Sequence, residues 1–287
     1  MNENLPLKTP VIKQWLHDAA AQLTDAGISS AKLDAEIILA HTLRQSRTYL
    51  HAHDDDLLTA RQQEIADARL QLRLDRTPIA YIVGHKEFYG RMFKVNPSTL
   101  IPRPESENII TILKELTVQT EMSLDTTPKR LVDVGTGTGC LGISAKLEIP
   151  ELDVTLVDIS RHALTVAEAN AKTLHAEVTL TRSDLLSAYP FTADYIIANL
   201  PYVDVIWERS PETHYEPSLA LFAPDEGLAL IYKLIDQMPS HLHPGGYALL
   251  EADPRQHATI IKYAKDRSFS LHEVRDYIIA LQYTPQQ

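Results

Sequence analysis

The stretch Leu131–Cys140, LVDVGTGTGC, decides the fold of this 287-residue chain. Its apolar first half is typical of a buried β-strand, and Gly135, Gly137 and Gly139 follow immediately. The next stretch, LGISAKLEI, has the pattern of a helix. Because glycine lacks a Cβ atom, a turn of this composition can lie directly against a ligand. We therefore expect a strand, a ligand-binding turn and a helix in this order.

The spacing of the glycines narrows the kind of ligand. It is G-x-G-x-G, whereas dinucleotide-binding turns have G-x-G-x-x-G, so NAD is disfavoured. No lysine follows the turn, so it is not a phosphate-binding P-loop.

Strand and helix patterns alternate after the turn. The strand patterns are DVTLVDIS, EVTLTRSDLL, ADYIIANLPY and GGYALLEAD, and the helix patterns are RHALTVAEANAKTL, GLALIYKLIDQMPSHL and RQHATIIKYAKD. SLHEVRDYI and IALQYT are predicted to form a closing pair of strands. Such alternation predicts an α/β domain with a mostly parallel sheet covered on both faces. Ligands of these folds bind at the carboxyl ends of the strands.

Three successive strands each carry an acid at or near that end: Asp133, Asp158 and Asp184. A carboxylate at the end of the second strand can accept hydrogen bonds from ribose hydroxyls. The turn itself contains no basic residue that could hold a pyrophosphate. The combination favours a nucleoside that lacks phosphate and carries a positive charge, and S-adenosyl-L-methionine is such a ligand.

The fourth strand ends in Asn199-Leu200-Pro201-Tyr202. Asn and Pro are ordinary turn residues, so a plain loop is the simplest interpretation. In this crevice, however, the Asn199 side-chain oxygen and the Leu200 carbonyl could accept both hydrogens of an –NH2 group. Pro201 restricts Leu200 to extended geometry, and Tyr202 could stack on a planar amide or base. The tetrapeptide therefore predicts methyl transfer to a planar nitrogen.

The part before the turn is organised differently. Helical patterns begin at VIKQWLHDAAAQLTDAG and SSAKLDAEIILAHTL, and Thr59 with Gln62 forms a predicted capping box before a third helix. We predict a helical domain over residues 1–75 and a connector over 76–105. The connector contains a hairpin in EFYGRMFKV, with its turn at Gly90-Arg91, and an extended STLIPRPESE segment. The methyltransferase domain is expected over 106–287.

Composition and charge exclude or disfavour several functional classes of protein. The net charge is −11, from 27 basic and 38 acidic side chains, and this disfavours a surface built to bind nucleic acid. No apolar run reaches the roughly 20 residues of a membrane span, and the N-terminus lacks the features of a signal peptide. The single cysteine, Cys140, fits a reducing compartment and is interpreted as a small packing residue. No Cys/His cluster has zinc spacing. We expect a cytoplasmic protein without a metal.

These motifs resemble the HemK/PrmC family of protein-(glutamine-N5) methyltransferases, which modify peptide chain release factors. TPIAYIVGHKEFYG resembles the family's P-x-x-Y-I-x-G-x-x-E-F, and LIPRPESE matches its L-I-P-R-P-E-[TS]-E. DVGTGTGC matches its glycine turn, and YEPSLAL followed by EGL resembles its late loop. The resemblance covers nearly the whole chain.

The resemblance implies a helical substrate-recognition domain, a hairpin connector and a class I Rossmann-like domain that binds S-adenosyl-L-methionine. It implies that Asn199, Leu200, Pro201 and Tyr202 are catalytic. Asn199 and Tyr202 would hold the glutamine amide of a release factor GGQ motif. The implied cofactor contacts are Asp133, Gly135, Thr136, Gly137, Thr138, Gly139, Asp158, Ile159, Asp184, Leu185 and Asn199. No membrane contact and no direct nucleic-acid binding are expected.

The sequence departs from the family pattern at three places. Leu200 stands where the family usually has the first proline of N-P-P-Y. The late loop, usually D-G-G-x-D-G-L, reads FAPDEGL from Phe222 to Leu228. Ala252-Asp253 follows Glu251 where the family has E-I-G.

Four alternatives remain. N-L-P-Y also occurs in rRNA adenine dimethylases, but their glycine turn lies near the N-terminus and their helical domain follows it. A DNA adenine methyltransferase would need a target-recognition region. A sister subfamily methylates a glutamine of a large-subunit ribosomal protein. A non-catalytic, methyltransferase-like binding protein is the fourth, and Leu200 is the feature that favours it.

Overall fold

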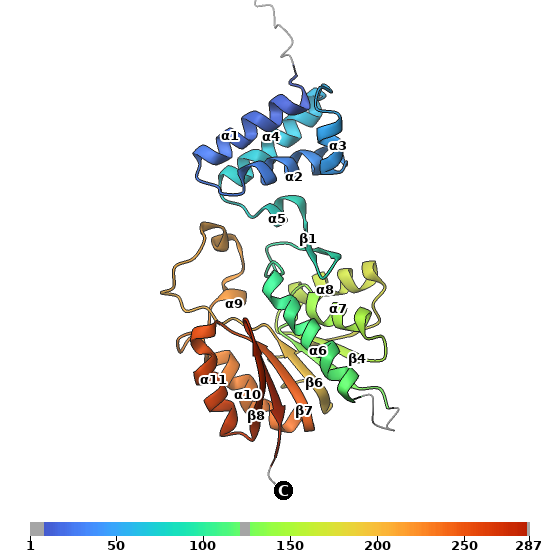
Figure 1. Cartoon of the computed structure of the whole chain (residues 1–287), viewed down its shortest axis with the longest axis vertical. Helices are drawn as coiled ribbons and strands as arrows, with labels where there is room; N and C mark the ends of the chain where they lie inside the picture. Colours follow the sequence, from blue (N-terminus) through green and yellow to red (C-terminus); the bar gives the residue numbers. More distant parts are fainter. Residues whose placement is uncertain (1–8, 121–126, 286–287) are drawn as a thin grey trace, which may run out of the picture. The chain divides into compact units, whose positions relative to one another are not determined.

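A computed structural model describes residues 9–120 and 127–285 of the chain (Figure 1). These residues divide into two units. The first contains the described residues up to Gly84 together with Ser210–Tyr215, and the second contains the others. None of the helices in the described residues has the length and apolar character of a membrane span.

The first unit is helical, as predicted. Its helices are α1 (Ile12–Asp25), α2 (Ala31–Leu43), α3 (Arg47–Ala52), α4 (Ala60–Leu74) and α5 (Ile79–Val83). Thr59 forms the predicted capping box with Gln62 at the start of α4. Apolar side chains spaced three or four residues apart, such as Trp15, Ala19 and Leu23 on α1, form a buried core between the helices.

A buried ion pair joins two helices of this unit to the short 3-10 helix η2 (Pro211–Tyr215). Arg73 donates to Asp34 over 2.7 Å and to Glu212 over 3.1 Å. Arg73 and Asp34 are almost fully buried. Because η2 comes from the loop after the N-L-P-Y motif, the helical unit is assembled from two distant parts of the sequence.

The connector forms the predicted hairpin from β1 (His85–Phe88) and β2 (Arg91–Lys94). The predicted turn position was wrong by one residue, because Tyr89 and Gly90 occupy the turn with φ angles of 49° and 70°. The extended interpretation of STLIPRPESE was wrong for its last part. Pro104–Ser106 forms the 3-10 helix η1, which leads into α6 (Glu107–Thr120). Proline is compatible with a helix at its first position, where no backbone N–H is needed.

The second unit contains a seven-stranded sheet in the order β5-β4-β3-β6-β7-β9-β8. Its strands are β3 (Arg130–Val134), β4 (Asp153–Asp158), β5 (Thr179–Arg182), β6 (Ala193–Ala198), β7 (Leu242–Glu251), β8 (Phe269–Arg275) and β9 (Ile278–Tyr283). The first five strands in the spatial order are parallel, whereas β9 and β8 are antiparallel additions. The chain runs outward from β3 to β5 and then returns to place β6 beside β3. This reversal creates the crevice where α/β folds bind ligands.

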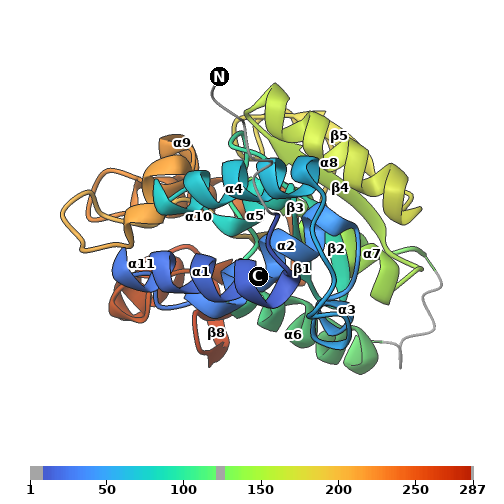
Figure 2. The ribbon, with the colours of Figure 1, turned by 90° about the horizontal axis from the view of Figure 1, so that it is seen from above.

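Helices cover both faces of the sheet, and the remaining elements are short. The helices are α6, α7 (Cys140–Glu148), α8 (Arg161–Leu174), α9 (Ser218–Leu221), α10 (Ala229–His241), η3 (Pro254–Gln256) and α11 (His257–Lys265). Figures 1 and 2 show α7 and α8 on one side of the sheet and α10 and α11 on the other. Alternate residues of β6 point to opposite faces of the sheet. Tyr195 and Ile197 pack with α6 and α7, whereas Ile196 packs with α10 and α11. The predicted α/β architecture is confirmed.

Candidate active site

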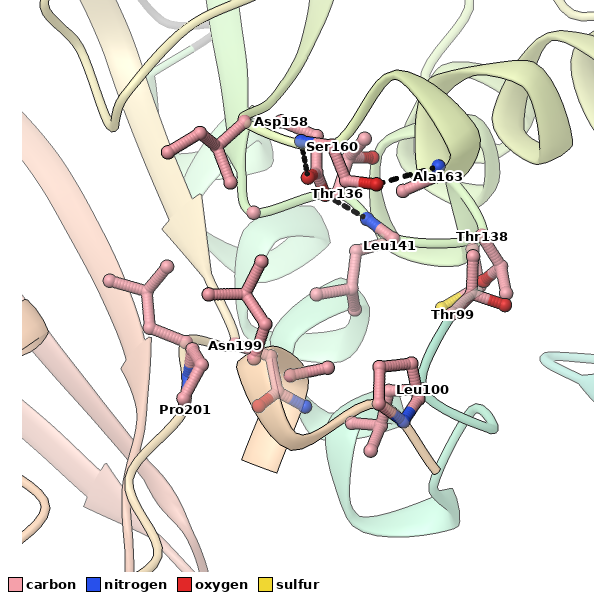
Figure 3. Close-up of a pocket in the computed structure, with 18 of the residues that line it drawn as sticks. Thr99, Leu100, Thr136, Thr138, Leu141, Asp158, Ser160, Ala163, Asn199 and Pro201 are labelled. Atoms are coloured by element: carbon pink, nitrogen blue, oxygen red, sulfur yellow. Dashed lines mark hydrogen bonds between the residues drawn. The ribbon is translucent and has the colours of Figure 1, made fainter. Parts of the chain in front are cut away.

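A cavity opens at the carboxyl ends of the parallel strands (Figure 3). Its walls come from the glycine turn after β3, the ends of β4 and β5, the tip of β6 and the connector. Among the residues predicted from the sequence, the cavity is lined by Gly135, Thr136, Gly137, Thr138, Asp158, Ile159, Asp184, Leu185, Asn199, Leu200 and Pro201. Asp133, Gly139 and Tyr202 are not among the lining residues.

The glycine turn and Asp158 are held together by backbone hydrogen bonds. Gly137 N–H donates to Asp158 Oδ2 over 2.9 Å, and Ser160 N–H donates to Oδ1 over 2.8 Å. Burial raises the pKa of Asp158, although these backbone donors oppose the rise. Two N–H donors leave free lone pairs on the carboxylate, which can accept hydrogen bonds from a ligand.

Gly137 shows why this turn needs glycine. Its φ of +55° is unfavourable for residues with a side chain, and a Cβ atom here would meet nothing closer than 3.9 Å. The position therefore faces open space, and a ligand can approach the backbone closely.

Asp133 lies behind the turn instead of on the cavity wall. It is fully buried, and its Oδ2 accepts from the Thr136 hydroxyl over 2.6 Å and from Gly142 N–H over 2.9 Å. Burial raises its pKa to about 6. Its other oxygen, Oδ1, has no hydrogen-bond partner in the described residues. In this structure Asp133 supports the turn from behind.

The third acid, Asp184, also lines the cavity. Asp184 Oδ2 accepts from Lys233 Nζ over 2.6 Å, and both side chains are about half exposed. Leu185 follows in a left-handed conformation with φ of 52°. Ile159 is 46% exposed on the neighbouring strand end. The exposed Ile159 side chain could cover a planar base while the acid accepts a hydrogen bond from the amino group of that base.

The tip of β6 meets the glycine turn because Val134 of β3 pairs with Ala198 of β6. The residues that follow this pair are therefore neighbours. Leu200 is buried and packs on the turn, where a Cβ atom on Gly135 would lie only 2.8 Å from Leu200 Cδ2. Figure 3 shows Asn199 and Pro201 on the cavity wall.

Asn199 and Tyr202 are both held by polar contacts. Asn199 Nδ2 donates to Ser106 Oγ over 3.0 Å, and the Tyr202 hydroxyl donates to Glu251 Oε1 over 3.3 Å. Gln256 Nε2 donates to the Tyr202 carbonyl over 2.9 Å. Burial is the first cause of the raised pKa of Tyr202, so its hydroxyl stays protonated. Contacts from η1, from the end of β7 and from η3 thus hold the side chains and the backbone of this loop.

Sequence reasoning missed the contribution of the connector. Five of its residues, Ser98, Thr99, Leu100, Pro102 and Arg103, also line the cavity, and so does Ser106 directly after its predicted end. The proline-rich STLIPRPESE segment was the available signal, since its stiffness suggested a structured role. Arg103 is the only basic residue among the described lining residues, and Glu216 pairs with it. The cavity therefore offers carboxylates without an unpaired cation, which suits a cationic nucleoside.

Cys140 lines the cavity at the start of α7 and is half-buried. Burial raises the pKa of its thiol to about 12. The thiol therefore stays protonated at neutral pH and is a poor nucleophile.

Family models match two parts of the chain. Residues 14–84 match the PrmC N-terminal domain, and residues 114–209 match the methyltransferase small domain.

Curated relatives match most of the chain. A release factor glutamine methyltransferase of Koribacter versatilis is 39% identical, over 85% of this chain and 88% of the relative. The protein of the same name from Escherichia coli K12 is 35% identical, over 83% of this chain and 84% of the relative.

Solved structures share the fold at low identity. The catalytic domain of hMettl16 aligns with a TM-score of 0.52 and 13% identity, covering 81% of this chain and 84% of that one. The 16S rRNA N2 G1207 methyltransferase of T. thermophilus aligns with a TM-score of 0.51 and 15% identity, covering 70% of this chain and 50% of that one. These neighbours confirm a methyltransferase fold.

Proposed function

The chain belongs to the family of release factor glutamine methyltransferases, and from this premise we propose which reaction its cavity performs and with which residues. The reaction is transfer of a methyl group from S-adenosyl-L-methionine to the side-chain amide nitrogen of a release factor glutamine. We propose that this is the glutamine of the GGQ motif. The observation that supports the site best is that Asn199 lies beside the glycine turn at the reversal point of the sheet.

S-adenosyl-L-methionine supplies the electrophilic methyl group on a positively charged sulfur. In our proposal the glycine turn from Gly135 to Gly139 holds its methionine part. Asp158 accepts from the ribose hydroxyls, and Asp184 and Leu185 flank the adenine. The paired state of Arg103 leaves the net charge of the cavity wall negative, which suits this ligand.

Asn199 and Leu200 then hold the acceptor. The Asn199 side-chain oxygen and the Leu200 carbonyl each accept one hydrogen of the glutamine –NH2 group, and Tyr202 stacks beside the planar amide. Fixed in this way, the nitrogen points at the methyl carbon for in-line displacement. The nitrogen donates an electron pair to the carbon, the carbon–sulfur bond pair remains on sulfur, and one proton leaves the nitrogen for solvent. No residue needs to remove that proton beforehand.

We further propose that the helical unit recognises the release factor. We also propose the domain boundaries predicted from the sequence, which are 1–75 for the helical domain, 76–105 for the connector and 106–287 for the methyltransferase domain. The unit in the structure runs to Gly84 and includes Ser210–Tyr215, so the loop after the catalytic motif belongs with it. The acidic net charge of −11 supports a protein substrate without direct nucleic-acid binding, and we propose a cytoplasmic location.

The test is methyl transfer from labelled S-adenosyl-L-methionine to a purified release factor, beside a copy whose GGQ glutamine is changed to alanine. Large-subunit ribosomal proteins and rRNA are assayed in parallel. We expect label on the unaltered release factor alone. Label on a ribosomal protein or on rRNA, with none on the release factor, would reject the proposal in favour of those alternatives. Binding of the cofactor without any transfer would favour a non-catalytic protein.

A further inference from the structure

A buried carboxylate lies directly behind the N-L-P-Y loop. Glu251 ends β7 and is only 2% exposed. Its Oε2 accepts from the Ser106 hydroxyl over 2.5 Å, and its Oε1 accepts from the Tyr202 hydroxyl over 3.3 Å. A buried carboxylate is costly unless it is hydrogen-bonded, so these two donors must stay in place. The carboxylate thus joins Ser106 of η1 to Tyr202 of the N-L-P-Y loop.

The second contact of Ser106 reaches Asn199. Asn199 Nδ2 donates to Ser106 Oγ over 3.0 Å. A serine hydroxyl has a single hydrogen, and in this structure it is given to Glu251. Only lone pairs of Ser106 Oγ then remain for Asn199, so the asparagine must present its NH2 group to the serine. Its Oδ1 oxygen is consequently directed away from Ser106.

The orientation of this amide decides what the site can bind. The two ends of an asparagine side chain have nearly the same size, so packing alone distinguishes them poorly. A flipped Asn199 would offer hydrogens to the acceptor –NH2 group, and donor would face donor. The hydrogen-bond order Glu251, Ser106, Asn199 prevents the flip.

We propose that Ser106 and Glu251 are positioning residues, which fix Asn199 with its oxygen toward the acceptor amide and hold Tyr202 beside it. This inference rests on the proposed function. It assigns a role to two motifs that the cofactor site does not explain, namely the PRPESE segment of the connector and the glutamate at the end of β7. The Glu251 carboxylate thus orients two side chains of the proposed catalytic loop. It contacts Tyr202 directly and acts on Asn199 through Ser106.

The test compares Ser106→Ala, Ser106→Thr and Glu105→Gln. Ser106→Ala removes the bridging hydroxyl. Ser106→Thr keeps it, and the family motif accepts threonine here. Glu105→Gln is the matched control, because Glu105 is an exposed neighbour that takes no part in the hydrogen bonds joining Glu251, Ser106 and Asn199. Its charge raises the pKa of Glu251, but at pH 8 that carboxylate is mostly ionised in either case. For each variant we would measure cofactor Kd, the melting temperature, and kcat on release factor at saturating substrates at pH 8.

We expect Ser106→Ala to lower kcat about tenfold or more, the equivalent of one ordinary hydrogen bond, with cofactor Kd within about twofold of wild type. Ser106→Thr should keep most of the activity, and Glu105→Gln should be unchanged. Wild-type kcat in Ser106→Ala would overturn the inference. So would a parallel loss of cofactor affinity and kcat that threonine does not restore.

A second readout needs no activity. In protein labelled with 15N at asparagine side chains, the Asn199 NH2 signal is assigned by its absence in Asn199→Ala. We expect its hydrogens to exchange with solvent slowly in wild type and faster in Ser106→Ala. Equal exchange would overturn the positioning role. If wild type failed to methylate release factor while this exchange difference persisted, the proposed substrate would be wrong and the positioning role would stand.

Discussion

Gly135 lies so close to Leu200 that a Cβ atom added to the glycine would stand 2.8 Å from Leu200 Cδ2. The glycine turn and the N-L-P-Y loop are therefore in direct contact. Leu200 is the residue that departs from the family's N-P-P-Y pattern. Its side chain is 4% exposed, so leucine replaces the stiffness of a proline with buried packing on the turn.

This contact predicts the behaviour of Gly135→Ala. The substitution imposes both a steric clash and a φ of +73°, which costs a residue with a side chain about 1–2 kcal/mol. We expect the free energy of unfolding in urea to fall by at least that amount, and cofactor affinity to fall with it. Adding Leu200→Ala should remove the clash but not the backbone strain. A Gly135→Ala protein as stable as wild type would contradict the contact.

Asp158→Asn tests the cofactor site. The carboxylate accepts from Gly137 and Ser160 and is proposed to accept from ribose hydroxyls as well. Loss of a charged acceptor costs about 1.5–3 kcal/mol, so we expect cofactor Kd in calorimetry to rise about 10- to 100-fold. Activity at saturating cofactor should stay near wild type. Asp184→Asn is the comparison, and its half-exposed ion pair with Lys233 predicts a smaller effect.

If the Asp158 variant instead bound the cofactor normally and lost turnover, the assignment of this acid to the ribose would be wrong.

Activity should fall as the pH drops through about 7. Burial raises the pKa of Glu251 to about 7, with Glu105 adding to the rise and Arg103 opposing it. The protonated Tyr202 hydroxyl and the Cys140 thiol are the other titratable groups that face it. Above this pKa the carboxylate accepts from Ser106 and Tyr202. Below this pKa the Glu251 carboxyl is neutral and carries a hydrogen of its own. That hydrogen disrupts the chain of hydrogen bonds from Glu251 through Ser106 that orients Asn199.

The measurement is kcat against pH from 5.5 to 9, with cofactor saturating throughout. Glu251→Gln should flatten the acid limb because it removes the titrating group. An acid limb that is unchanged in Glu251→Gln would assign the pH dependence to another residue.

The sequence could predict the sheet and the part of the cavity wall formed by the glycine turn and the strand ends, because both depend on local patterns. A strand, a glycine turn and a helix are neighbours along the chain, and the carboxyl ends of parallel strands meet by the geometry of the fold. It could not predict the contact of Ser106 with Glu251, because 145 residues separate the two and only folding brings them together. The 3-10 helix at Pro104 was missed since proline disfavours helix in general but is accepted at the first position.

The helical unit offers a prediction about stability. The contact of Glu212 with Arg73 could not be predicted from the sequence either, because the loop after the N-L-P-Y motif carries no local pattern that indicates its partner. Arg73→Met would leave the buried Asp34 carboxylate without a positive partner, although the Ser30 hydroxyl would still donate to it. We therefore expect the free energy of unfolding to fall by about 3–5 kcal/mol. Asp34→Leu in the same chain should recover much of the loss. No destabilisation in Arg73→Met would show that the ion pair contributes nothing.

The central claim is that Asn199 at the tip of β6 acts mainly on the acceptor amide and contributes little to the affinity for the cofactor. The most direct test is Asn199→Ala, with methyl transfer to release factor and cofactor Kd measured on the same preparation. We predict that the rate of transfer falls on the order of 100-fold or more, because the acceptor nitrogen is no longer aligned. Cofactor Kd should remain within about threefold of wild type, an energetic change of less than roughly 0.7 kcal/mol. Unchanged transfer, or a cofactor affinity that collapses together with the rate, would contradict the account.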